Sequence, residues 1–213
     1  SWYRQPRMQK MTTDERTGTT DRRRNDRRAE IVRCAIDAMR HRGATAATTG
    51  LVCTCAGVTK GVFAHHFPGG KDELLAAAVE TASADIGNLI NHALQRHGTA
   101  GAISAFFDFY ADMVDDDPSF GCPIAGVIVD HVDGEVDDSL RTGTAHALMS
   151  WARLVTDALR ADGLAPDDAE QLAIAVISSM EGAIILSTAH GNGHALRATG
   201  RVMADMVRLR SGS

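Results

Sequence analysis

Cysteine and histidine side chains are the first candidates for chemistry in this sequence, because they can bind metal ions or act as nucleophiles. Cys53 and Cys55 have C-x-C spacing, and His65 and His66 follow them closely. On a helix, residues two apart point roughly 200° away from each other, so both thiols cannot easily reach one metal ion. We therefore predict no metal site and expect these cysteines to pack among small core residues.

The motifs of common enzymes are missing from the sequence. It has no Gly-rich phosphate loop, no nucleophile elbow and no carboxylate–histidine spacing typical of a metalloenzyme. We therefore predict no catalytic residues and no cofactor. The four cysteines, which include Cys34 and Cys122, lack the spacing of a secreted disulfide framework, so we expect them to be reduced.

Apolar segments are too short or too interrupted to cross a membrane. The N-terminus is charged and lacks an apolar signal core. The most apolar stretch, residues 173–186, is interrupted by Ser178, Ser179 and Glu181. We expect no membrane partner and a cytoplasmic location.

Composition and charge divide the chain into two parts. Of 213 residues only 5% are aromatic, while Ala, Leu, Ile, Val and Met are plentiful, which favours an all-α fold. Residues 22–71 hold ten Lys and Arg against three Asp and Glu, whereas residues 72–213 hold eight against 21. A basic small region beside an acidic larger one suits a protein whose first part alone contacts a polyanion.

Residues 48–67 contain two short helix signals separated by a tight break. Thr48 and Thr49 can cap the first helix, Gly57 can adopt the left-handed conformation of a sharp turn, and Thr59 can cap the second helix. Phe67 and the following Pro-Gly-Gly end it. This order has the spacing of a helix-turn-helix, in which the start of the second helix enters a DNA major groove; the alternative is an ordinary helical hairpin.

The segment AGVTKGVFAHHFPGGKDEL, preceded by a helix from about Arg27 to Arg42, resembles the DNA-binding signature of the TetR family of transcriptional regulators. The doubled glycine of FPGGK and the later Gly121-Cys122-Pro123-Ile124-Ala125 resemble the LmrA/YxaF-like branch. Two positions depart from the family pattern: Ala64 replaces a usual Tyr, and Val62 replaces a small polar residue. These departures concern base and phosphate contacts rather than the fold.

The resemblance implies a domain organisation. We expect a disordered basic arm over residues 1–24, a three-helix helix-turn-helix domain over 25–71, and a helical ligand-binding and dimerisation domain over 72–213. In the last domain, apolar periodicity predicts a long helix from Lys71 to about His97, a break at Gly98, and further helices that begin near 99, 123, 138, 166 and 194. Excess apolar surface on the last two helices, together with the resemblance, predicts a homodimer.

Two sets of residues are candidate binding sites. For DNA we predict a basic or small set around the second helix of the helix-turn-helix: Arg27, Thr48, Thr49, Thr59, Lys60, Gly61, Val62, His65, His66 and Lys71. For a small-molecule ligand we predict apolar walls with a few polar anchors, of which Glu181 and His131 are the main ones. That set is Phe106, Phe109, Tyr110, Met113, Cys122, His131, His146, Met149, Trp151, Met180 and Glu181.

These patterns together indicate a transcriptional regulator and not an enzyme. We expect a homodimer that binds a palindromic, double-stranded operator and, from the resemblance, represses until a small-molecule effector releases it. Two alternatives remain: a helical carrier or enzyme with a vestigial DNA-binding head, motivated by Ala64 and Val62, and a thiol-based redox regulator using Cys53 or Cys122.

Overall fold

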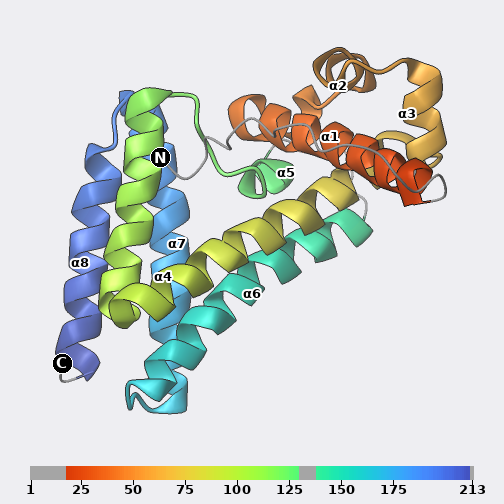
Figure 1. Ribbon diagram of the computed structural model, residues 1–213. Coiled ribbons are helices and arrows are strands. Elements are labelled where there is room, and N and C mark those ends of the chain that lie inside the picture. The colour runs from red at the N-terminus through yellow and green to blue at the C-terminus, as the bar shows by residue number, and fades with distance from the viewer. Residues whose placement is uncertain (1–17, 130–137, 212–213) are drawn as a thin grey trace.

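The computed structural model describes residues 18–129 and 138–211, and this part of the chain consists of helices without strands (Figure 1). The all-α prediction is therefore confirmed. The helices are α1 Gly18–Arg42, the short 3₁₀ helix η1 Ala44–Ala46, α2 Thr49–Ala56, α3 Lys60–His66, α4 Gly70–Asp116, α5 Ala125–Val129, α6 Asp138–Ala161, α7 Pro166–His190 and α8 His194–Ser211.

Helices α1, α2 and α3 form a small N-terminal unit, which we call the head. Thr48 Oγ1 accepts the backbone N–H of Leu51 at 3.3 Å, and Thr59 Oγ1 accepts that of Val62 at 3.3 Å, so both predicted N-caps are present. Each such cap stabilises a helix by about 1 kcal/mol. Gly57 has φ 62° and ψ 34°, the left-handed conformation that lets α3 leave α2 at a sharp angle.

The core of the head forms where α2 packs against α1 and α3 packs against α2. Ile31 of α1 and Val52 of α2 are fully inaccessible to solvent, and Phe63 and Phe67 bring α3 into the same core. The Phe63 and Phe67 rings lie 5.5 Å apart, and the Arg28 guanidinium lies 4.9 Å from the centre of the Phe67 ring. These contacts fix the orientation of a helix that is too short to be stable alone.

Helix α4 connects the head to the remaining helices and changes direction at Gly98 (Figure 1). Gly98 has φ 65° and ψ 176°, a backbone conformation that side-chain-bearing residues rarely adopt. The break predicted at this residue is therefore confirmed. The part before Gly98 runs along α6, and the part after it returns beside α7 and α8.

The helices α4, α6, α7 and α8 form the larger unit, which we call the body. Close approach of α4 and α8 depends on glycine: a Cβ on Gly200 would lie 2.5 Å from Phe107 Cβ, and one on Gly193 would lie 2.5 Å from the Ala111 carbonyl oxygen. Arg197 of α8 pairs with Asp112 and Asp115 of α4 at the edge of this contact. Helix α7 has the length and apolar composition of a membrane span, but it packs against α4, α6 and α8 as a core helix does.

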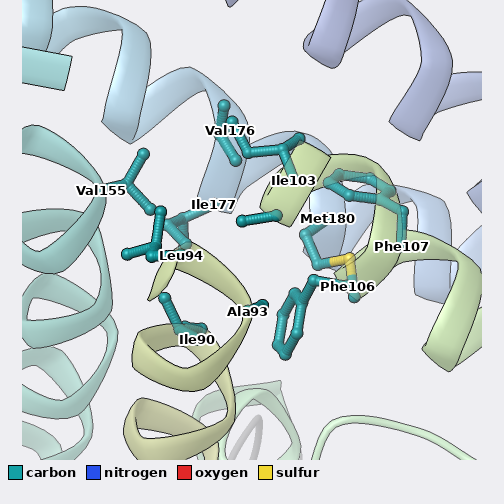
Figure 2. Close-up of a pocket in the computed structure, with 11 residues that line it drawn as sticks. Ile90, Ala93, Leu94, Ile103, Phe106, Phe107, Val155, Val176, Ile177 and Met180 are labelled. Carbon is teal, nitrogen blue, oxygen red and sulfur yellow. The ribbon is translucent and has the colours of Figure 1, made fainter. Parts of the chain in front are cut away.

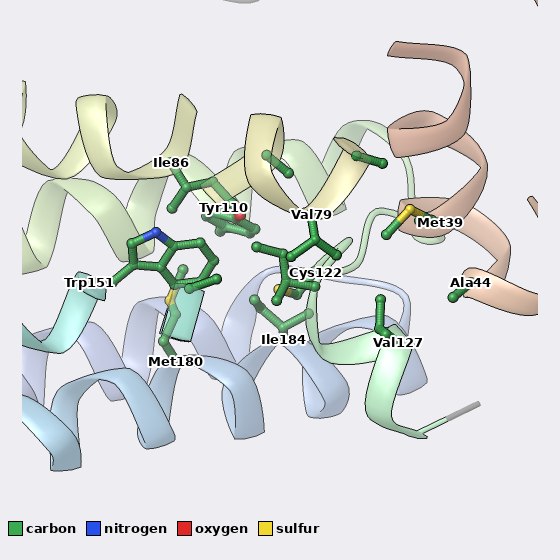
Figure 3. Packing of buried hydrophobic residues seen from close by; sticks show 14 of the residues in the cluster. Met39, Ala44, Val79, Ile86, Tyr110, Cys122, Val127, Trp151, Met180 and Ile184 are labelled. Carbon is green, nitrogen blue, oxygen red and sulfur yellow. The ribbon is translucent and has the colours of Figure 1, made fainter. Parts of the chain in front are cut away.

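The segment that links α4 to α5 forms the junction between head and body. The Gly121 N–H donates to the Arg40 carbonyl at 3.2 Å, and a Cβ at Gly121 would lie only 2.9 Å from that oxygen. The Arg40 guanidinium lies 4.4 Å from the centre of the Phe120 ring, and His41 Nδ1 hydrogen-bonds Ser119 Oγ at 2.9 Å. Figure 3 shows buried side chains of the hydrophobic cluster that extends from Met39 in the head to Trp151 and Met180 in the body.

Two expectations differ from the structure. Helix α1 begins at Gly18 and not near Arg27, so residues 18–24 of the expected arm are helical, while 1–17 lie outside the described residues. Cys34 and Cys55 are joined by a disulfide and are not reduced. The C-x-C spacing relates Cys55 only to Cys53 on the same helix, whereas the partner of Cys55 is Cys34 on α1. The other two cysteines, Cys53 and Cys122, are free and buried as expected.

Candidate functional site

The N-terminal end of α3 is an exposed surface. Lys60, Gly61 and Val62 are all exposed, with Val62 38% accessible. A Cβ at Gly61 would approach nothing closer than Thr59 Oγ1 at 3.8 Å, so internal packing does not require glycine there. A backbone without a side chain at this point allows close approach of an external partner.

Basic residues of α1 extend this surface toward the end of α3. Arg27 is exposed, and Arg24, Arg27 and Arg28 are close enough to His66 to act on its charge. Partial burial, then the positive charges of His65 and these arginines, hold the pKa of His66 below its usual value. A neutral His66 limits repulsion within a cluster that is already strongly positive.

The remaining predicted DNA-binding residues lie around the same helices. Thr48 is exposed but uses its hydroxyl as the α2 cap, and Thr49 is half-buried. The Lys71 ammonium donates to the Thr45 carbonyl at 3.1 Å, which ties the start of α4 to η1. An ammonium has three donors, so this bond leaves Lys71 able to contact a phosphate as well. Ala64 is exposed too, so the two departures from the family pattern face outward and not into the core.

A narrow apolar pocket lies where α4 bends, between α4, α6 and α7 (Figure 2). Its free volume is about 20 Å³, which is room for little more than one water molecule. The side chains around it come from both sides of Gly98 in α4, and from the two helices packed against it. They are Ile90, Ala93, Leu94, Ala102, Ile103, Phe106, Phe107, Val155, Val176, Ile177 and Met180.

Among the predicted ligand-binding residues that the structure describes, only Phe106 and Met180 line this pocket. Tyr110 is buried beside it in the aromatic cluster, where its ring lies 5.4 Å from that of Phe106 and 5.7 Å from that of Phe109. Trp151 donates its indole N–H to the Ser83 carbonyl at 3.0 Å and so joins α6 to α4.

Glu181, one of the two predicted polar anchors, does not line this pocket either. Glu181 is partly buried and forms a hydrogen bond with the buried Cys122 thiol. Burial raises the pKa of the Glu181 carboxyl. The pKa of the Cys122 thiol is also raised, mainly by its burial and secondly by the nearby Glu181 charge. Met113 is half-buried, and Met149 and His146 are exposed. His131 lies outside the described residues.

Sequence reasoning missed most of the pocket because its walls are ordinary apolar side chains. Ile90 and Ala93 belong to one predicted helix and Ala102 to the next, but nothing in the spacing shows that the chain folds back at Gly98 and brings them together. The available signal was the glycine break inside a continuous apolar pattern. The predicted ligand-binding set consisted instead largely of aromatic and Met residues, and most of those belong to the hydrophobic core or pack against it.

A second, open groove of about 570 Å³ lies between α4 and α6. Its walls include polar side chains such as Glu80, Asn88, Asn91 and His146. Of the predicted ligand residues within 18–129 and 138–211, His146 alone lines this groove.

The fold and the exposed second helix define a helix-turn-helix DNA-binding protein, and comparisons with known proteins agree. Residues 31–78 match the family described as "Bacterial regulatory proteins, tetR family", and residues 99–202 match "Transcriptional regulator LmrA/YxaF-like, C-terminal domain". A Mycobacterium tuberculosis HTH-type transcriptional regulator is 34% identical over 164 residues, which cover 75% of this chain and 83% of that protein. The Bacillus subtilis regulator YxaF is 28% identical over 166 residues, which cover 77% of this chain and 86% of YxaF.

Solved structures share the fold at low sequence identity. A TetR transcriptional regulator from Chloroflexus aurantiacus superposes with a TM-score of 0.74 at 22% identity, covering 89% of this chain and 98% of that one. One from Legionella pneumophila gives a TM-score of 0.74 at 17% identity, covering 92% and 99%. The chain is a transcriptional regulator. It belongs to the TetR family and has a C-terminal domain of the LmrA/YxaF-like type.

Proposed function

We propose that this regulator is a homodimeric repressor that binds a palindromic operator through two copies of its head and is released by an apolar effector in the body. The exposed, basic end of α3 is the observation that carries this proposal. In this assignment residues 25–71 form the DNA-binding domain and 72–213 the effector and dimerisation domain, and the protein acts in the cytoplasm without catalysing a reaction.

The proposed DNA contacts divide by chemistry. Lys60 and Arg27, as exposed cations, neutralise phosphates, and Lys71 supplies a further contact from the start of α4. Gly61 admits a phosphate close to the backbone. Val62 stands where the family usually has a small polar residue, and its exposed methyl groups suit the C5-methyl group of thymine in the major groove. The departure at Val62 would then change which base is read without abolishing binding.

The proposed dimer interface lies on α7 and α8. Ile185 is 63% exposed, Leu186 53%, Val202 55% and Leu209 83%, which is unusual for large apolar side chains in adjacent helices. By contrast, Ile184 and Val207 are buried inside the subunit, so they are not interface residues. Pairing α7 and α8 with their symmetry copies would cover the exposed set in a four-helix arrangement.

The proposed effector is uncharged and largely apolar, because none of the described residues that line the pocket is charged. A pocket with about 20 Å³ of free volume cannot hold such a molecule unless side chains and helices move. Both halves of α4 line it, so an occupant must press on the half that leads to the head. A ligand that binds better to the opened body thereby disfavours the head spacing that fits DNA.

Selection from a random-sequence duplex library tests the DNA-binding part. The dimer should enrich a palindromic sequence, and its affinity for that duplex should fall about 10³–10⁵-fold between 50 and 200 mM salt if six to ten phosphates are contacted. Enrichment of no sequence, together with salt-independent retention, would instead support a helical carrier or enzyme whose head no longer binds DNA.

A further inference from the structure

Cys34 and Cys55 form a disulfide that joins two helices of the DNA-binding head. Cys34 is in the middle of α1 and Cys55 is in the last turn of α2, with their Cα atoms 5.9 Å apart. That separation is within the ordinary range for a disulfide, so the backbone needs no movement to bring the sulfurs together. Cys53, two residues earlier, points into the core and remains a free thiol.

We propose that Cys34 and Cys55 are a reversible oxidation site, which peroxides convert to the disulfide and small thiols return to the dithiol. Disulfides are rare in reducing cellular compartments, where DNA-binding regulators work, and those that occur there are usually redox-sensing. A disulfide within a DNA-binding head therefore marks a state that forms when oxidant is present.

The exposure of the two cysteines indicates which of them reacts with peroxide first. Cys55 is exposed and Cys34 is half-buried. The Cys55 thiolate attacks a peroxide oxygen, the O–O bond breaks, and the departing hydroxide takes up the thiol proton as water. The Cys34 thiolate then attacks the Cys55 sulfenic sulfur, and the second hydroxide leaves as water with the Cys34 proton. Two thiols are oxidised, and one hydrogen peroxide is reduced to two waters.

The position of Cys55 connects this chemistry to α3, the helix that we propose contacts DNA. Cys55 precedes the left-handed Gly57, where the chain turns from α2 into α3. Fixing Cys55 to α1 therefore holds the starting point of α3 on the helix that braces it. Because α3 is short and depends on Phe63 and Phe67 for its packing, a cross-link at its base should reduce the fraction of heads in which α3 is displaced.

The oxidised regulator should accordingly be more stable and bind DNA more tightly. We expect hydrogen peroxide to raise the melting temperature by about 5–10 °C and the affinity for the library-selected duplex at least about fivefold, with dithiothreitol reversing both. The stability change concerns the protein alone, whereas the affinity change rests on the proposed DNA-binding function.

The test uses the full chain with and without peroxide, quenched by an alkylating agent. Peptide mapping by mass spectrometry should find a Cys34–Cys55 linked peptide, and thermal melts and fluorescence anisotropy should give the two shifts. Cys34→Ser and Cys55→Ser should each abolish them. The matched control, Cys53→Ala with Cys122→Ala, removes the other two thiols and should respond to peroxide as the wild type does.

Each result distinguishes the site from the DNA-binding function. No linked peptide, or equal melting temperatures in both redox states, would overturn the proposed oxidation site. A linked peptide with the expected melting shift but equal DNA affinity in both states would overturn its control of the head. If neither state binds any duplex while the peptide and melting shift are found, the oxidation site is supported and the repressor proposal fails.

Discussion

The surface around α3 in the head and the pocket of the body differ in where their residues come from. Most of the surface around α3 is formed by one continuous stretch of chain, whose helix caps Thr48 and Thr59 each bond a backbone N–H three positions later. The pocket is formed by three helices, and its α4 wall comes from both sides of Gly98. A site built from local contacts has a sequence signature, whereas a site built from distant apolar residues has none.

The two sites also differ in charge and in how accessible they are to a partner. The head surface is exposed and basic, so it is ready to meet a polyanion without rearrangement. The pocket is apolar and almost full. Binding at the first site is therefore expected to depend on salt, and binding at the second on how easily the helices separate.

The largest expected effect comes from the surface that would link two subunits. Ile185→Arg places a charge at the proposed two-fold interface in both subunits, where a buried unpaired charge is strongly destabilising. The dimer should dissociate, and the affinity for the selected duplex should fall by about 10²-fold or more, because each head then binds alone. Sedimentation measures the first effect and anisotropy the second. A monomeric wild type at micromolar concentration would contradict the dimer proposal.

The pocket is tested by filling it. Ala93 lines the pocket, and Ala93→Leu should occupy its small free volume, so an effector that normally releases the operator about 5–150-fold should no longer do so. Operator affinity without effector should stay unchanged. Ala145→Leu, at an exposed position on α6, is the matched control and should keep the response. Met149, which the sequence assigned to the ligand-binding set, is exposed and does not line the pocket.

The head surface is tested by removing one charge. Lys60→Ala should weaken binding to every duplex roughly tenfold and lower the salt slope by about one per subunit, because a phosphate contact carries no sequence information. Arg160→Ala, an exposed cation at the far end of α6, should change neither quantity. A loss confined to the selected sequence would instead assign Lys60 to base readout.

The smallest effect concerns the buried carboxyl of α7. Burial raises the pKa of Glu181, so the folded state keeps this proton at pH values where the unfolded chain has lost it. The stability it contributes is present below its ordinary pKa of 4.5 and is lost as the pH rises through the folded value. Glu181→Gln should therefore raise the melting temperature at pH 7 by about 2–4 °C and leave it nearly unchanged at pH 4.

Glu170→Gln, an exposed carboxylate on the same helix, is the control for that prediction. Equal melting shifts for the two variants at pH 7 would show that the effect is general charge removal and not burial.

Much of the fold was predictable because its boundaries depend on local backbone chemistry. Threonine caps, the left-handed Gly57, the break at Gly98 and the proline at the start of α7 each fix a helix end within a few residues. The first helix was predicted too short, since residues 18–24 are polar and show no apolar period even though α1 includes them.

The two candidate sites differ in how far the sequence could assign their residues, again because local spacing is visible in a sequence and distant contacts are not. Residues such as Lys60 and Gly61 could be assigned because the helix-turn-helix places them by spacing alone. Glu181 was expected to anchor a ligand because a carboxyl interrupts an apolar helix, yet its partner in the fold is the Cys122 thiol, 59 positions earlier in the chain. No periodicity encodes that pairing.

The sequence by itself therefore determined the all-helical architecture, the family and the exposed, basic end of the head that we propose contacts DNA, because caps, turns and charge act over short distances along the chain. Only the tertiary structure decided that Cys34 meets Cys55, that the chain on both sides of Gly98 closes one apolar pocket, and that Ile185 is exposed while Ile184 is buried. Those outcomes depend on how helices pack against one another, and packing brings together residues that have no fixed spacing in sequence.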